Sequence, residues 1–421
     1  MDTGKILYEY RADRQHPADS LAKVMTLLLA VSACESGKAR PNDMVEMTET
    51  AYYNIGSTNT TLGIMPGETM TLLDLMYCAF VGNADEACNM VAEHISGSVM
   101  AFITEMNALA KELGCINTSF MNTHGQYSQA QYTTARDQFV IYREAMGHQM
   151  FVEISGALRY DTKADVDSEP YKLTNLNTLL NLNSKYYYKP CSSGAVSATF
   201  EGGYSFVSYA EADGLSLISV ILGSDTIVFE DESAEMRNLT EARRLFEWGF
   251  SQFSWRTIVS PDKPPVGKAP VTHGAGADFV NLRPETTITM LLDNDIRDED
   301  FIRTITIYSV KNNEVLYAPI TAGEVLGEMT LTRNGENYGT VLLVANTNID
   351  LNRLQYIKMQ LTDMLGSRIA RLIMWALMML VLGYVALVIR YNVLRRKRLR
   401  RIAEAKKRLV DERRGQDRRD D

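Results

Sequence analysis

The sequence contains few of the residues that bind metal ions or cross-link small domains. Among its 421 residues there are five histidines and five cysteines, and no CxxC pair occurs. Zinc sites and disulfide frameworks depend on closely spaced cysteine and histidine, so we predict neither of them and no cofactor. The cysteines are scattered and odd in number, and we expect most of them to be small buried residues. A single disulfide bond between two of them is the alternative.

Positive charge is scarce in most of the chain. Residues 390–421 hold 14 Lys/Arg and 6 Asp/Glu, a local charge of +8, although the formal charge of the whole chain is −9. The preceding 389 residues therefore carry −17. Because a nucleic-acid-binding surface needs a basic face for the phosphates, this acidic body excludes nucleic acid as the partner. The length allows two or three folding units, each with its own core.

Long apolar runs are also rare, and the segment MDTGKILYEY at the start has none. The exception is 372–389, where 18 consecutive residues without a charge come close to the roughly 20 that a helix needs to cross a bilayer. We expect a transmembrane helix there, preceded by a juxtamembrane helix at 349–371. A core helix of a soluble domain is the alternative, which the uniformly apolar faces and the following basic tail disfavour.

The flank after this run, from Arg395 to Arg401, is far more basic than the flank before it. The positive-inside rule predicts a single-pass membrane protein with a cytoplasmic tail (390–421) and its main domains outside. That topology requires an export signal, so either the printed start lies downstream of a removed signal or the start is truncated. We expect the tail to form a charged helix near anionic lipid. A solvated charge run that only fixes topology explains it equally well.

Residues 1–256 mix strand-like and helical patterns. The segments KILYEY (5–10) and LSLISVILG (215–223) predict strands, the second buried on both faces, and 20–33 has apolar residues at helical spacing. Three further segments predict helices: LLDLMYCAF, EACNMVAEHI and ARDQFVIYREAM (135–146). Strands at both ends with helices between them indicate an α+β unit whose terminal strands share one sheet.

A proline- and glycine-rich stretch separates this unit from the next. Residues 257–277, which contain SPDKPPVGKAP (260–270), are expected to be a linker without regular structure. Short alternating segments then follow between Asn, Gly and Asp turns: TTITMLLDND, FIRTITIYSV, EVLYAPI, EMTLTRNG and YGTVLLVAN. This pattern predicts a small all-β domain at 278–348.

Ser20 and Lys23 have S-x-x-K spacing at the start of a predicted helix. One helical turn places the amine beside the hydroxyl, and a partly desolvated lysine can act as the base that activates a serine nucleophile. The positive end of the helix favours the negative charge that develops. The motif alone is weak. The alternative is that Ser20 caps the helix and that Lys23 is solvated or salt-bridged.

The residues around this pair carry a resemblance to a known family. The run LYEYRADRQHPADSLAKVMT resembles, without a gap, the active-site entry of the serine D-alanyl-D-alanine carboxypeptidases, the low-molecular-mass penicillin-binding proteins. The likeness continues through PGETMTLLDLMY, EACNMVAEHISGS, LGCINTSFMNTHG, YTTARD and NTLLNLNSKYYY, and LYAPITAGEVLGEM resembles a segment of the family's β domain. The resemblance therefore implies a penicillin-binding, β-lactamase-like transpeptidase domain followed by a small all-β domain and a C-terminal transmembrane helix.

The resemblance also implies a mechanism. Ser20 would attack the carbonyl between the last two D-Ala residues of a peptidoglycan stem peptide and form an acyl-enzyme, while Lys23 takes the Ser proton. Water would then release the shortened peptide. The stem peptide is the implied partner, and β-lactams are a further implied ligand class. His124, in a segment that resembles the family's N-P-H-G, is expected to be structural.

Two further family motifs are degenerate in this chain. The S-x-N position falls on Asn83-Ala84-Asp85, where an amide cannot relay a proton at neutral pH and Asp85 replaces a neutral amide that orients substrate. We expect Asp85 to pair with Lys23 and to spoil it as a base. The K-T-G position falls on Ala195-Val196-Ser197, with no Lys even if the register shifts by a residue or two. The cation that would meet the substrate carboxylate is missing there, and Lys185 and Lys189 lie upstream.

Two hypotheses of different class therefore remain. In the first, the protein is a working or weak carboxypeptidase with Ser20, Lys23 and Asn83 in the catalytic positions and Asp85, Ala195, Val196 and Ser197 in the substrate-binding positions. In the second, it is a membrane-anchored pseudoenzyme that binds wall peptide or a protein partner without hydrolysis. A β-lactamase is a third reading, which the length of the resemblance and the β domain disfavour.

Overall fold

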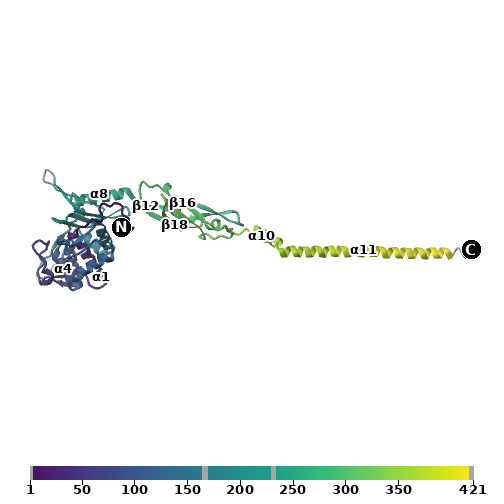
Figure 1. Ribbon diagram of the computed structural model, residues 1–421, viewed down its shortest axis with the longest axis horizontal. Coiled ribbons are helices and arrows are strands. Elements are labelled where there is room, and N and C mark those ends of the chain that lie inside the picture. The colour runs from purple at the N-terminus through teal and green to yellow at the C-terminus, as the bar shows by residue number, and fades with distance from the viewer. Residues whose placement is uncertain (1–2, 164–168, 229–233, 417–421) are drawn as a thin grey trace. The chain divides into compact units, whose positions relative to one another are not determined.

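The computed structural model describes residues 3–163, 169–228 and 234–416 (Figure 1). The chain divides into two compact units. The first comprises Met1–Arg256 with Met290–Arg297, and the second comprises Thr257–Thr289 with Asp298–Asp421.

The first unit is mainly helical. Its helical elements are η1 (Asp19–Leu21), α1 (Ala22–Glu35), α2 (Glu49–Tyr52), α3 (Leu72–Phe80), α4 (Asp85–Ser96), α5 (Val99–Glu112), α6 (Ala135–Ala145), α7 (Gln149–Gly156), η2 (Thr178–Leu180) and α8 (Arg237–Gln252). The helices predicted from LLDLMYCAF, EACNMVAEHI and ARDQFVIYREAM are confirmed as α3, α4 and α6.

Most strands of this unit are short. They are β1 (His16–Pro17), β2 (Met44–Glu46), β3 (Thr69–Thr71), β4 (Tyr132–Thr133), β5 (Arg159–Asp161), β6 (Lys172–Thr174), β7 (Cys191–Thr199), β8 (Gly203–Ala212), β9 (Leu215–Ser224), β10 (Thr226–Val228) and β11 (Ala234–Met236). The long strands form one antiparallel sheet in the order β7-β8-β9, with Ser197 opposite Ser205. The strand predicted at 215–223 is confirmed as β9, although most of its residues are only half-buried.

Helices cover both faces of this sheet. Phe206 and Val207 are adjacent on β8, so their side chains point to opposite faces. Phe206 packs with Leu239 and Ala242 of α8, whereas Val207 belongs to the large apolar cluster that contains α1. Helix α1 lies inside that cluster, with ten of its 14 residues buried. A helix that is apolar on nearly every face is stable only in such a position, and its N-terminus is therefore held rigidly.

The strand predicted at 5–10 is wrong. No strand occurs between residues 3 and 15 of the described chain, and the apolar side chains of KILYEY point largely into solvent: Ile6, Tyr8 and Tyr10 are 48%, 60% and 67% exposed. β-propensity fixes a strand only where a neighbouring strand pairs with it, and this segment has no such neighbour. The expectation that the terminal strands share one sheet is wrong for the same reason.

The second unit contains a five-stranded antiparallel sheet in the order β13-β14-β18-β17-β16. Its strands are β13 (Gly267–Pro270), β14 (Phe279–Pro284), β16 (Ile302–Ile307), β17 (Val325–Arg333) and β18 (Glu336–Ala345). The remaining elements are η3 (Asp298–Asp300) and α9 (Tyr308–Lys311), and two strands, β12 (Phe253–Val259) and β15 (Ile288–Asp293), contain residues of both units. The all-β region predicted from the sequence is confirmed.

Two details of that prediction are wrong. The expected linker is not free of regular structure, because β12 extends to Val259 and β13 lies in the proline-rich stretch. Among the described residues, strand β13 pairs only with β14, and an edge strand tolerates Pro270, which has no N–H to donate. The segment EVLYAPI forms only isolated bridges instead of a strand, at Tyr317 and Ile320.

The chain ends in two helices, α10 (Arg353–Gly366) and α11 (Arg368–Gln416). Helix α11 contains Arg371–Leu409, which is long and apolar enough to cross a membrane by length and composition. The helix predicted for the charged tail is confirmed as far as Gln416. The expected juxtamembrane helix is shorter than 349–371 and ends before Ser367.

Candidate active site

The N-terminus of the buried helix α1 positions Ser20 and Lys23. Ser20 lies in the 3-10 turn η1 and Lys23 in the first turn of α1, so one turn of chain separates their side chains. The interpretation of Ser20 as a helix cap is wrong. The cap position is Leu21, without a side-chain hydrogen bond, because the 3-10 turn shifts the start of the α-helix by two residues.

Lys23 is only 3% exposed, and its ammonium group donates to three oxygens. Its Nζ lies 2.7 Å from Asp85 Oδ1, 2.8 Å from the Asn83 carbonyl oxygen and 2.5 Å from Asn83 Oδ1. An ammonium has three donors and no acceptor, so these contacts use all of them. Within the described residues, no hydrogen bond joins Lys23 to the Ser20 hydroxyl. The predicted pairing of Asp85 with Lys23 is confirmed.

Asp85 is the first residue of α4 and is itself buried. Its second oxygen, Oδ2, accepts hydrogen bonds from Asn59 Nδ2 at 2.8 Å and from the Thr60 amide at 3.2 Å. The helix N-terminus adds a favourable dipole for a carboxylate. A buried ion pair is tolerated only when its remaining lone pairs are satisfied, and here both carboxylate oxygens have partners.

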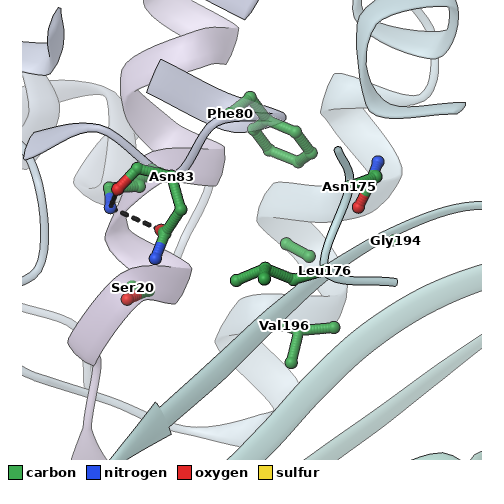
Figure 2. Close-up of a pocket in the computed structure, with 9 residues that line it drawn as sticks. Ser20, Phe80, Asn83, Asn175, Leu176, Gly194 and Val196 are labelled. Carbon is green, nitrogen blue, oxygen red and sulfur yellow. Dashed lines mark hydrogen bonds between the residues drawn. The ribbon is translucent and has the colours of Figure 1, made fainter. Parts of the chain in front are cut away.

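Asn83 holds the turn that brings this carboxylate to Lys23. Its φ is +55°, in the left-handed region that asparagine enters more readily than most residues. The side chain and the carbonyl of Asn83 both point at Lys23, which Figure 2 shows for the side chain as a dashed contact. The residue therefore serves as an acceptor for the ammonium in this arrangement.

His124 lies behind the ion pair, with Nδ1 3.7 Å from Asp85 Oδ2. Burial lowers the pKa of His124 to about 4, with Lys23 lowering it further and Asp85 opposing the shift. The imidazole is therefore neutral near pH 7, and its Nδ1 accepts a hydrogen bond from the Gln126 amide at 3.2 Å. These contacts support a structural interpretation of this residue.

Strand β7 forms the opposite wall of the site. Ala195 and Val196 line the same cavity as Ser20, Lys23 and Asn83, and Ser197 Oγ accepts a hydrogen bond from the Ser20 amide at 3.2 Å. The geometry thus brings all the residues singled out from the sequence into one place. Lys23 is the one cation among the residues that line the cavity, counted over the described chain; Lys185 lies over the Tyr186 ring.

Sequence reasoning missed four residues of the lining: Phe80, Asn175, Leu176 and Gly194. Figure 2 shows Ser20 and Asn83 on one side of the pocket, with Phe80, Asn175 and Leu176 across from them. Phe80 ends the apolar run of α3, so its pattern resembled core, and the other three belong to no charged or nucleophilic motif. The cavity measures about 10 Å³, room for about one water molecule.

The five cysteines and the consecutive tyrosines 186–188 do not line this site. All five cysteines are free, and four of them are buried. Tyr186 and Tyr188 pack against the cluster that contains Phe206, and the Tyr188 ring stacks on Phe246.

Comparisons with known proteins identify the scaffold. A sequence model of the D-alanyl-D-alanine carboxypeptidases matches residues 1–226. The chain is 27% identical to the D-alanyl-D-alanine carboxypeptidase DacF of Bacillus subtilis over 340 residues, which cover 80% of each protein. It is 26% identical to DacC of Escherichia coli, over 83% of this chain and 82% of that protein.

Solved structures share the fold. Penicillin binding protein 5 from Haemophilus influenzae superposes with a TM-score of 0.58 and 22% identity, over 82% of this chain and 94% of that one. Penicillin binding protein 6B from Escherichia coli gives a TM-score of 0.60 at 20% identity, over 81% and 92%. The helical unit and the all-β region thus have the architecture that the sequence led us to expect, and the chain belongs to the D-alanyl-D-alanine carboxypeptidase family.

Proposed function

We propose that this protein is a membrane-anchored serine D-Ala-D-Ala carboxypeptidase whose acylation step is strongly impaired. One observation carries the proposal: all three donors of Lys23 are held by Asp85 and Asn83, and none reaches the Ser20 hydroxyl. A general base must lie within hydrogen-bond reach of the proton that it removes and must have a free lone pair. An ammonium ion-paired with a buried carboxylate meets neither condition.

The reaction at stake is acyl transfer from a stem peptide to Ser20. The Ser20 oxygen would bond to the carbonyl carbon of the penultimate D-Ala, and its proton would leave through a base. The peptide C–N bond would then break, and the terminal D-Ala would depart with a proton on its nitrogen. Hydrolysis of the ester by water would regenerate Ser20.

The wall opposite Ser20 supports the same conclusion. The residues at the K-T-G position are Ala195, Val196 and Ser197, so β7 offers no cation to the carboxylate of a terminal D-Ala. Loss of one positioned donor or cation typically slows an enzyme by about 10²–10³. Loss of a free base and of this cation together leaves little turnover.

A pseudoenzyme that binds wall peptide or a protein partner is the second candidate. The observation in its favour is that Lys23, the candidate base, is held by Asp85 and Asn83, which leaves Ser20 without an activating partner among the described residues. The two candidates differ in whether Ser20 is ever acylated.

The location that we propose follows from α11. Its apolar run, residues 372–389, would cross the cell membrane once, and the basic residues after Ile389 would hold the tail in the cytoplasm. The two units would then face the cell wall, where the stem peptide is found.

Acylation tests the proposal directly. Full-length protein in detergent is incubated with a fluorescent penicillin, and intact-protein mass is followed over hours, with Ser20→Ala as the control. D-Ala release from a D-Ala-D-Ala-terminated pentapeptide is measured in parallel. We expect labelling that is slow and confined to the wild type, and D-Ala release at least about 10³-fold below a usual kcat of about 10 s⁻¹. Release at a usual rate would overturn the proposal, and absence of any label would favour the pseudoenzyme.

A further inference from the structure

The backbone amide of Ser20 is already occupied in this structure. It donates to Ser197 Oγ at 3.2 Å, and Ser197 is only 1% exposed on β7. Ser20 precedes the first hydrogen-bonded turn of α1, so its N–H is one of the donors that a helix start leaves without an intrahelical acceptor. The hydroxyl of Ser197 takes the acceptor position that such a donor offers.

This donor has a specific value in acyl transfer to serine. When the serine oxygen attacks a carbonyl, negative charge develops on the carbonyl oxygen, and the backbone N–H of the nucleophile is one of the groups that stabilises it. A substrate carbonyl at Ser20 would therefore compete with Ser197 Oγ for the same N–H. Glycine or alanine at position 197 would offer no such competitor.

A second contact fixes the two chain segments against each other. Asp19 Oδ2 accepts a hydrogen bond from Thr199 Oγ1 at 2.8 Å, and Thr199 lies two residues beyond Ser197 on the same face of β7. Asp19 is 2% exposed, and burial raises the pKa of its carboxyl. A Cβ on Gly202 would come within 1.7 Å of Asp19 Oδ2, so the loop after β7 fits closely over this carboxyl. Together the contacts Asp19–Thr199 and Ser20–Ser197 form a clasp between η1 and β7.

We propose that Ser197 is a positioning residue that blocks the site from within: its hydroxyl occupies the place of the substrate's carbonyl oxygen at the Ser20 amide. Because the Asp19–Thr199 contact still holds the backbone of η1 against β7, the block is released by rotation of the Ser197 side chain and not by separation of the two segments. The inference rests on the proposed function, since it explains a second cause of slow acylation beside the ion pair of Lys23.

The test uses a ligand that needs the Ser20 amide in its tetrahedral form. A D-Ala-derived peptide boronic acid bonds through boron to the Ser20 oxygen, the serine proton passes to buffer, and one boron-bound hydroxyl lies where the carbonyl oxygen would be. Its affinity is measured for the full-length wild type, Ser197→Ala and Ser208→Ala. Ser208 is the matched control, because it is a buried serine of the same sheet whose hydroxyl has no hydrogen-bond partner in the described chain.

We expect Ser197→Ala to bind the boronic acid about tenfold more tightly than the wild type, the equivalent of one hydrogen bond to a charged group. Ser208→Ala should leave the affinity unchanged. Thermal melting establishes that each variant folds, and Ser197→Gly serves as a second variant if the alanine variant does not. Equal affinity of the wild type and a folded Ser197 variant would overturn the inference.

A second experiment distinguishes an error in the Ser197 inference from an error in the proposed function. The penicillin acylation rate is measured for Asp85→Asn with and without Ser197→Ala. Acylation that rises in Asp85→Asn, with no further gain from Ser197→Ala, contradicts the Ser197 block and leaves the proposed function intact. Fast acylation by the wild type itself contradicts the proposed function, whatever Ser197 does.

Discussion

At the scale of single residues, the main feature of the site is the buried ammonium of Lys23 and the oxygens that accept its hydrogen bonds. Lys23 is enclosed, and Asp85 and Asn83 supply the acceptors that make its burial tolerable. The sequence predicted the pair Lys23–Asp85 because both residues occupy motif positions. It did not predict the role of the Asn83 carbonyl, which depends on a left-handed backbone at that residue.

His124 makes the stability of the fold depend on pH. Burial lowers its pKa to about 4 from the ordinary 6.5, so between these values the unfolded chain binds a proton that the folded chain does not. Stability is therefore fully present above about pH 6.5 and falls as the pH drops towards 4, by about 3 kcal/mol in all. Asp85 and Lys23 are the charged groups that face the ring.

Urea unfolding of the wild type and His124→Asn at pH 7 and pH 5 checks this expectation. The buried carboxyls with raised pKa, such as Asp19 and Glu86, contribute a slope of opposite sign in both proteins, so the comparison removes them. The wild type should lose more stability than the variant on acidification. Equal losses would show that His124 does not titrate in this range.

At the scale of elements, the site depends on the close approach of η1, β7 and the loop that contains Gly125. The helical spacing of 20–33 predicted α1, but a 3-10 turn before it could not be anticipated, because it results from packing against β7. The strand predicted at 5–10 is wrong for a related reason: its residues have high β-propensity, yet pairing with a neighbouring strand decides whether a strand forms. Contacts between distant segments, such as Ser20 with Ser197, leave no local signal.

Gly125 shows how tight that approach is. Its φ is +96°, and a Cβ there would lie 2.0 Å from the Asp19 carbonyl oxygen. We expect Gly125→Ala to lower the free energy of unfolding by at least about 2 kcal/mol, through backbone strain and overlap with η1 together.

Gly97→Ala is the matched control for Gly125. Gly97 also has a positive φ, +75°, but its Cβ would meet nothing within 4 Å, so only the backbone strain of about 1 kcal/mol remains. Chemical denaturation of both variants measures the difference. Equal costs at the two positions would mean that the loop can move away from Asp19.

At the scale of the whole molecule, the hydrophobic pattern of the sequence predicted the main parts of the chain correctly. The apolar run at 372–389 and the alternating segments after residue 278 indicated a candidate membrane helix and an all-β region, and both are present. The proline-rich stretch was misread because an edge strand accepts proline, which a local pattern does not reveal.

The proposed anchor predicts the behaviour of the full chain in cells. Expressed behind a cleavable secretion signal, the protein should stay in the membrane pellet after carbonate washing. Leu380→Asp with Leu382→Asp should release it, because each Asp costs about 3 kcal/mol at the centre of a span. In a Cys34→Ala background, which removes the one native cysteine that is not buried, a cysteine placed in the tail by Ala405→Cys should react with an impermeant maleimide only after permeabilisation. Reaction in intact cells would contradict the proposed orientation.

The ratio of acylation rates between Asp85→Asn and the wild type tests the central claim most directly. Asparagine keeps an acceptor for Asn59 and Thr60 but removes the carboxylate that holds Lys23, so the amine is free to turn to Ser20. With a fluorescent penicillin and intact-mass detection, we predict that Asp85→Asn is acylated about 10- to 100-fold faster than the wild type, a part of the gain that a positioned base usually provides. The gain should vanish when Ser20→Ala is added. A folded Asp85→Asn protein that reacts no faster than the wild type would contradict the claim that this ion pair disables the site.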